Sequence, residues 1–185
     1  MKKLLKIMVL SFLLITNAMA NEEIKFNIIY KNEVYEIRHY SERLVAQTID
    51  YNDSNTFRKL YNYIAGSNNS SKKIEMTVPV TQTKKNNLSF MQFYLPSKFN
   101  KKTTPIPSNL DIEIKTIKEG YFAVIKYSGR SSNKNFIKYS QILKKELLYD
   151  KILIDSSAIR ATYNMPLTPP PFRRNEVMFR IKWEN

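Results

Sequence analysis

The chain has 185 residues, a formal net charge of +14 and a hydrophobic content of 43%. This length suits one globular domain, and an aromatic content of 12% excludes a disordered or collagen-like chain. The absence of cysteine excludes disulfides and thiolate metal sites, and the single histidine excludes a metal site built from two imidazoles. The 30 Lys and Arg residues are scattered along the chain, so their excess over 16 Asp and Glu does not by itself predict a polyanion site.

The N-terminal residues are typical of an export signal. A lysine-containing head precedes an apolar run over 7–15, and Ala18 and Ala20 occupy the positions that a signal peptidase reads. The run is shorter than the roughly 20 residues that a permanent membrane span needs. We therefore expect a signal peptide over 1–20 and a single periplasmic or secreted domain over 21–185, with no stable membrane anchor and no nucleic-acid partner. The alternative is an uncleaved N-terminal anchor.

Two strands are predicted near the start of the mature domain, over 24–30 and 35–40, where apolar residues alternate with polar ones. The second strand has two distinct faces, formed by Tyr35, Ile37 and His39 and by Glu36, Arg38 and Tyr40. This alternation places His39 on the more apolar face.

A first helix is predicted between a cap at Ser54 or Asn55 and an end at Gly66. Apolar residues recur along it at the spacing i, i+3, i+4 and i+7, at Phe57, Leu60, Tyr61 and Ile64. The spacing predicts one apolar helix face that packs against a sheet. Strand candidates follow over 76–80 and 90–95.

The pattern restarts after a polar, proline-containing loop over 98–109. Strands are expected over 111–116 and 121–127. A second helix is expected over Asn133–Tyr149, with a buried stripe of Phe136, Tyr139, Leu143 and Leu147. Three short strands are expected over 151–154, 159–163 and 177–183.

The two halves of the domain resemble each other. A shift of 77 residues aligns Glu36–Arg38 with Glu113–Lys115 and Ala46 with Ala123, and a helix follows in each half. These features predict an α+β fold in which two similar units share a curved antiparallel sheet. A sheet of this kind can leave an apolar cleft, and such a cleft favours a ligand-binding role over a catalytic one.

Five segments of the chain resemble, in order, the signature segments of the SOUL heme-binding proteins. They are YEIRHY at 35–40, YNYIAGSN at 61–68, KIEMTVPV at 73–80, MQFYLP at 91–96 and RRNEV at 173–177. The resemblance covers about 34–181. It implies a distorted β-barrel or curved antiparallel sheet of about eight strands with two helices and internal duplication. It also implies non-covalent binding of heme or a related tetrapyrrole, without established catalysis.

The resemblance further implies a candidate site. His39 matches the position proposed as axial iron ligand in those members that have histidine there, whereas other members bind heme through a hydrophobic pocket. The family's helix face maps onto Phe57 and Tyr61, which we expect to form the pocket wall together with His39. Met76 and Val78 on the following strand are candidates for its floor, and Arg58 is a nearby candidate cation for a propionate. Two alternatives stay open: His39 is an ordinary strand residue, and the wall residues are ordinary core residues of an amphipathic helix and a strand.

The motifs of several enzyme classes are absent, including G-x-S-x-G, H-E-x-x-H and a glycine-rich phosphate loop. We therefore expect a non-catalytic protein that binds heme reversibly. One alternative is a binding module for another amphipathic small molecule, and another is an envelope interaction protein with no heme. A hydrolase would require two carboxylates, or a Tyr–Glu pair, converging in the cleft.

Overall fold

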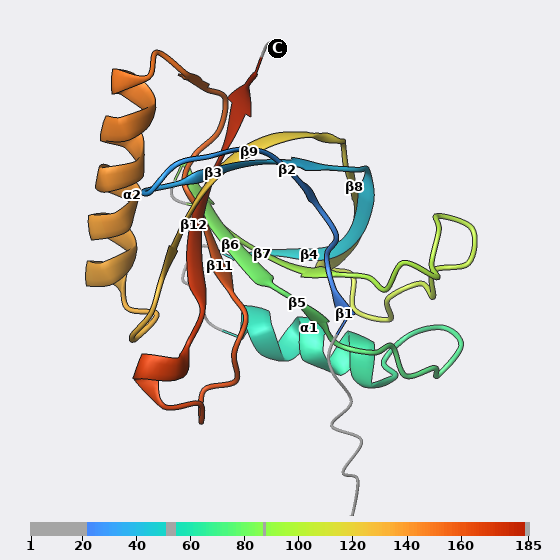
Figure 1. Cartoon of the computed structure of the whole chain (residues 1–185). Helices are drawn as coiled ribbons and strands as arrows, with labels where there is room; N and C mark the ends of the chain where they lie inside the picture. The colour runs from blue at the N-terminus through green and yellow to red at the C-terminus, as the bar shows by residue number, and fades with distance from the viewer. Residues whose placement is uncertain (1–21, 51–54, 87, 184–185) are drawn as a thin grey trace, which may run out of the picture.

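The computed structural model describes residues 22–50, 55–86 and 88–183, and the predicted signal peptide lies outside them. Within these residues, a ten-stranded antiparallel sheet curls into a half-barrel, with one helix beneath it and the other along its side (Figure 1). The predicted α+β architecture, a curved antiparallel sheet with two helices, is confirmed. No helix in these residues combines the length and apolar character that a membrane crossing needs.

Both predicted helices are present among strands, and the structure adds one long strand, β4, that the sequence did not predict. The first half contains β1 (Glu22–Glu23), β2 (Asn27–Lys31), β3 (Glu36–Tyr40), β4 (Arg43–Asp50), α1 (Thr56–Ala65), β5 (Thr77–Val78), β6 (Val80–Lys85) and β7 (Leu88–Tyr94). The second half contains β8 (Ile112–Ile117), β9 (Gly120–Tyr127), α2 (Asn133–Tyr149), β10 (Leu153–Ile154), β11 (Ile159–Thr162), a 3₁₀ turn (Pro170–Phe172) and β12 (Asn175–Lys182). The helix over Asn133–Tyr149 has the bounds that were predicted.

The internal duplication is visible in the sheet, whose strand order is β2-β3-β9-β12-β11-β6-β7-β4-β8, with β10 beside β12. The series β3, β4, α1, β6, β7 recurs as β8, β9, α2, β11, β12, and exchanging the two series reverses the order of the eight strands from β3 to β8. The shift of 77 residues carries β4 onto β9 and the first residue of α1 onto that of α2. Because β3 pairs with β9 and β4 pairs with β8, the first strand of each series pairs with the second strand of the other series.

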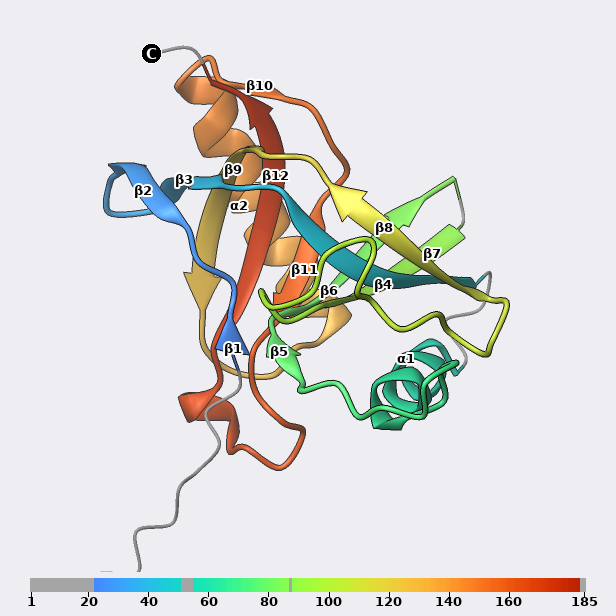
Figure 2. The ribbon, with the colours of Figure 1, turned by 90° about the vertical axis from the view of Figure 1, so that its right-hand side faces the viewer.

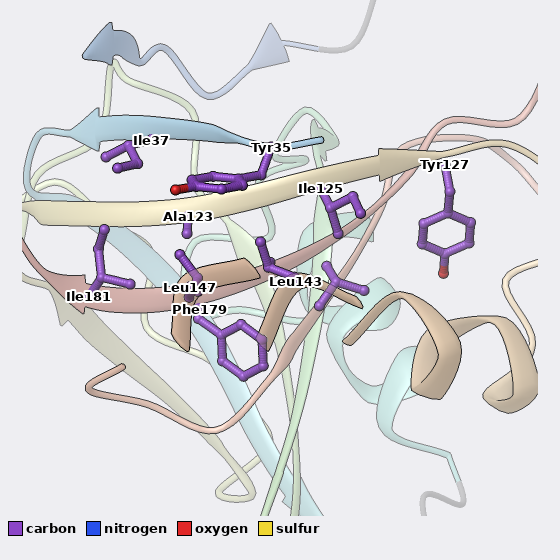
Figure 3. Packing of buried hydrophobic residues seen from close by; sticks show 10 residues of the cluster. Tyr35, Ile37, Ala123, Ile125, Tyr127, Leu143, Leu147, Phe179 and Ile181 are labelled. Atoms are coloured by element: carbon purple, nitrogen blue, oxygen red, sulfur yellow. The ribbon is translucent and has the colours of Figure 1, made fainter. Parts of the chain in front are cut away.

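The second helix covers the outer face of β3, β9 and β12. Ser132 caps it, since its side chain accepts a hydrogen bond from the Asn135 N–H at 3.2 Å. Leu143 and Leu147 are fully buried and point toward the strands (Figure 3). They pack in one cluster with Tyr35, Ile37, Ala123, Ile125, Tyr127, Val177, Phe179 and Ile181. The predicted stripe of α2 is therefore the one that packs on the sheet, with Phe136 and Tyr139 partly buried at its edge.

The first helix packs on the outer face of β4 and β7 (Figure 2). Its buried residues are Thr56, Leu60, Tyr63 and Ile64, and Gly66 ends it with a φ of 124°. Tyr63 is fully buried, and its hydroxyl donates to the carbonyl of Pro105 at 2.8 Å. This hydrogen bond satisfies the polar end of the ring, so that its burial carries little penalty. The buried stripe is rotated from the predicted one: Leu60 and Ile64 were correct, whereas Phe57 and Tyr61 are exposed.

The inner face of the half-barrel holds a third cluster of buried side chains, formed by Tyr40, Phe122, Val124, Ala161 and Met178. The N-terminal segment adds Ile24 and Phe26 to it. This segment is held by β1, which pairs in parallel with β5, and by the Ile24 N–H, which donates to the Val78 carbonyl at 3.1 Å. Figure 2 shows β1 and β5 side by side.

Candidate functional site

An exposed pair of aromatic rings marks the outer surface of α1. The rings of Phe57 and Tyr61 stack with their centroids 6.2 Å apart and an interplanar angle of 13°. The Phe57 ring also packs edge-to-face with the ring of Phe93 in β7, with the two centroids 5.2 Å apart. Phe57 is nevertheless 49% exposed and Tyr61 is 53% exposed. Arg58, also exposed, lies between them in sequence. We call Phe57, Arg58 and Tyr61 the aromatic face of α1.

The predicted site residues do not all gather at this face. Met76 packs against the buried cluster under α1, so the structure brings it close to the helix. Val78 lies in β5 and accepts a backbone hydrogen bond from Ile24 of the N-terminal segment.

The only histidine lies on another part of the sheet. His39 is half-buried in β3, and its ring lies 5.0 Å from that of Tyr121 in β9. In the sheet, β9 is separated from β7, which lies under α1, by β12, β11 and β6. Among the described residues, no group of three or more His, Asp and Glu could hold a metal ion. The structure therefore does not bring His39 to the aromatic face of α1, and its role as an iron ligand stays a prediction.

A buried network of charges occupies the inner face of the half-barrel. Arg38 and Glu176 are both fully buried, and the guanidinium donates to both carboxylate oxygens at 3.0 and 3.1 Å. Arg38 also donates through Nε to Glu36 at 2.9 Å. Sequence reasoning predicted that Glu36, Arg38 and Tyr40 share a face, but not that this face points inward onto a carboxylate from β12.

The carboxylate of Glu176 is saturated by donors. Besides the two bonds from Arg38, it accepts one from the Tyr163 hydroxyl at 2.7 Å and one from Arg174 Nε at 3.0 Å. A Tyr–Glu pair of the kind that a hydrolase would need is thus present. However, two guanidiniums balance the charge of this carboxylate, and four donors occupy its lone pairs, so none is left to bind a water or a substrate group. The arrangement is that of a structural ion pair.

Burial shifts the pKa values of the groups around this network. Burial raises the pKa of Tyr40 to about 12, although the charge and hydrogen bond of Arg38 oppose the shift. Burial, with the charge of Glu176, also raises the pKa of Tyr163 above its usual range. Burial pushes the pKa of Glu36 upward, but hydrogen bonds from Arg38 and Lys126 and their charges outweigh it and hold that pKa below its usual value.

These shifts predict a loss of stability in alkaline solution. Tyr40 and Tyr63 have pKa values raised by burial to about 12, whereas an unfolded tyrosine titrates near pH 10. A raised folded pKa gives stability that is complete below pH 10 and is lost as the pH rises toward 12. Urea unfolding at a series of pH values, with phenolate absorbance recorded, should show this decline. Tyr40→Phe should flatten it and the exposed control Tyr149→Phe should not; a folded protein whose tyrosines all titrate near pH 10 would contradict the prediction.

Several solved structures share this fold. The C-terminal domain of EcmrR matches with a TM-score of 0.62 and 12% identity, over 85% of this chain and 100% of that chain. An uncharacterized conserved protein from Listeria innocua matches with a TM-score of 0.62 and 9% identity, over 82% of this chain and 94% of that one. A hydrolase from Listeria innocua matches with a TM-score of 0.58 and 9% identity, over 83% and 94%. At such identities the likeness shows the fold alone.

The sequence comparisons identify the family. A search of curated proteins gave no match. The family model described as SOUL heme-binding protein matches residues 21–180, a range that contains all five signature segments. Because that match spans most of the chain, the protein belongs to the SOUL heme-binding protein family.

Proposed function

We propose that the protein binds heme or a related tetrapyrrole reversibly and without covalent attachment, that it catalyses no reaction, and that the ring lies on the aromatic face of α1. Membership of the SOUL family supports the class of ligand. The observation that carries the location is the exposure of Phe57 and Tyr61, which the helical spacing predicts as core residues. Neighbouring exposed aromatic rings on a small domain commonly mark a binding surface.

The chemistry of the face suits a flat apolar ring that carries carboxylates. A tetrapyrrole that covers Phe57 and Tyr61 removes apolar surface from water, and each aromatic contact adds about 0.5–1.5 kcal/mol beyond that burial. The Arg58 guanidinium can pair with a propionate through two parallel hydrogen bonds. Met76 lies under the same helix and adds a polarisable thioether to the packing below it.

Export is part of the proposal. The signal-like features of 1–20 support a mature domain in the periplasm or outside the cell, where a tetrapyrrole could be carried, stored or scavenged. The protein for the binding experiment should therefore be taken from the periplasmic fraction, and its N-terminal sequence should begin at Asn21.

A hemin titration followed by the Soret band tests the function and its location. Wild-type protein should bind one hemin saturably, and Phe57→Ala combined with Tyr61→Ala should weaken binding by about tenfold or more, since two stacking contacts are lost. Tyr149→Ala, which removes an exposed aromatic ring from the end of α2, is the matched control and should leave binding unchanged.

The same titration decides the role of His39. Because His39 lies against Tyr121 and away from α1, we expect His39→Ala to keep both the affinity and the Soret position. Loss of the Soret shift in His39→Ala would put iron on His39 and overturn the location on α1. The absence of saturable binding by the wild-type protein would overturn heme binding itself and favour another amphipathic ligand.

A further inference from the structure

A cavity of about 850 Å³ lies between the N-terminal segment, the turn from β3 to β4, and the loop that follows β7. None of its lining residues comes from α1, and none is among the site residues that the sequence predicted. The volume is within the range of small-molecule sites, about 300–1,000 Å³. The cavity is therefore a feature distinct from the aromatic face of α1.

One part of the cavity wall is apolar. Its apolar and aromatic lining residues are Ile24, Leu44, Tyr94, Leu95, Pro96 and Phe99. Tyr94, Leu95 and Pro96 are buried, and Tyr94 is fixed by the Thr77 hydroxyl, which donates to its carbonyl. A ligand with an apolar body would find a wall that is already in place, so little conformational entropy would be lost on binding.

The lining also carries an excess of positive charge. Lys25, Lys101 and Lys102 are exposed at its rim, and Arg43 is half-buried in its wall. Only two lining residues are acidic, Glu22 and Glu42. The electrostatic field of the cavity therefore favours an anionic ligand.

Arg43 has no counter-charge, because within the described residues no carboxylate lies within ion-pair distance of it. Its guanidinium lies over the rings of Tyr40, Phe122 and Tyr94, at 4.6, 5.2 and 5.5 Å from their centroids. It donates through Nη1 to the Ser41 carbonyl at 3.1 Å, while its buried Nε has no hydrogen-bond partner.

Burial of a charge normally requires a counter-charge, and Arg38 and Arg174 are both paired with Glu176. The half-buried Arg173 and Arg180 instead each donate to two backbone carbonyls. A half-buried Arg43 with an unsatisfied Nε lacks the equivalent counter-charge. An anionic group bound in the cavity would supply it.

We propose that this cavity is a second ligand site, which takes an apolar carboxylate of the fatty-acid type. The carboxylate pairs with Arg43, whose planar fork can hold it through two hydrogen bonds. The apolar body lies against Tyr94, Leu95 and Phe99. The exposed lysines attract the anion during its approach, and their effect weakens with added salt.

A pair of fluorescent probes that differ in charge tests the site. Anilinonaphthalene sulfonate carries an anion, and N-phenylnaphthylamine has the same rings without it. Arg43→Met should weaken the binding of the anionic probe and of competing dodecanoate by about tenfold or more, because a charge-assisted hydrogen bond is lost. The affinity for the uncharged probe should stay unchanged. Arg130→Met is the matched control, since Arg130 is exposed and does not line the cavity.

A change of ligand gives a second test that does not depend on how well Arg43→Met folds. Dodecanoate should displace the anionic probe from the wild-type protein, whereas methyl dodecanoate, which has no charge, should displace it at least about tenfold less well. Arg43→Lys, which keeps the positive charge, should retain part of the affinity.

Three results would overturn the inference. The first is no saturable binding of the anionic probe by the wild-type protein. The second is an equal loss of affinity for both probes in Arg43→Met, because Arg43 would then shape the cavity wall without binding an anion. The third is displacement of dodecanoate by hemin together with loss of hemin affinity in Arg43→Met. That result would place the tetrapyrrole in this cavity, and the protein would then have a single site. If Arg43→Met instead keeps hemin binding and loses dodecanoate binding, the hemin site and the carboxylate site are separate.

Discussion

Replacing Glu176 with glutamine is expected to lower the free energy of unfolding by about 3–5 kcal/mol, because it leaves a buried cation without its main counter-charge. Arg38 is fully buried, and Glu176 is the carboxylate that it holds through two hydrogen bonds. The amide keeps the shape of the carboxylate but presents N–H donors to Arg38, Arg174 and Tyr163, which are donors themselves. The loss should appear in urea unfolding as a lower midpoint with an unchanged slope.

The control for this substitution is a glutamate that pairs with a cation on the surface. Glu113 pairs with Lys115 at 3.0 Å, but their side chains are 60% and 40% exposed. Glu113→Gln should therefore lower the free energy of unfolding by less than about 1 kcal/mol. If Glu176→Gln is as mild as Glu113→Gln, the inner network contributes little. A double-mutant cycle with Arg38→Met then measures the coupling between Arg38 and Glu176 directly.

The helices were the elements that the sequence predicted best, because their signals are local. The period of apolar residues predicted α2, and Gly66 predicted the end of α1. Strand β4 was not predicted. Its Val45 faces the interior and its Ala46 faces α1, and both are fully buried. A strand covered on both faces lacks the polar–apolar alternation that identifies a strand with one exposed face.

The candidate sites were predicted less completely, since they depend on residues far apart in the chain. Sequence spacing predicted that Phe57 is buried, but the structure buries Tyr63 instead. The Tyr63 hydroxyl donates a hydrogen bond to the carbonyl of Pro105, in the loop before β8. Arg38 and Glu176 are 138 residues apart in the chain. Their pairing follows only once β3 and β12 are known to flank β9.

Arg43 gave no signal in the sequence at all. The aromatic rings that surround its guanidinium come from β3, β7 and β9, and the missing counter-charge is a property of the assembled interior. Residue type and spacing cannot report a charge that lacks a partner, because any acidic residue in the chain could have supplied one. The inner face of a half-barrel is where such long-range arrangements accumulate, since every strand contributes alternate residues to it.

The exchange of first strands between the halves implies that they unfold together. Leu60→Ala in α1 and Leu143→Ala in α2 each remove a fully buried side chain, and each should cost about 2–5 kcal/mol. The exposed control Leu148→Ala should change stability by less than about 0.5 kcal/mol. Because β3 pairs with β9 and β4 with β8, a cavity under either helix weakens both halves.

Both core variants should therefore shift one common unfolding transition. Circular dichroism reports the whole sheet, and fluorescence of Trp183 reports the cluster under α2. The two signals should stay coincident in Leu60→Ala, although the substitution lies in the other half. If the Trp183 signal kept its wild-type midpoint while the dichroism fell earlier, the halves would be separate folding units, and the pairing of β4 with β8 would contribute little to cooperativity.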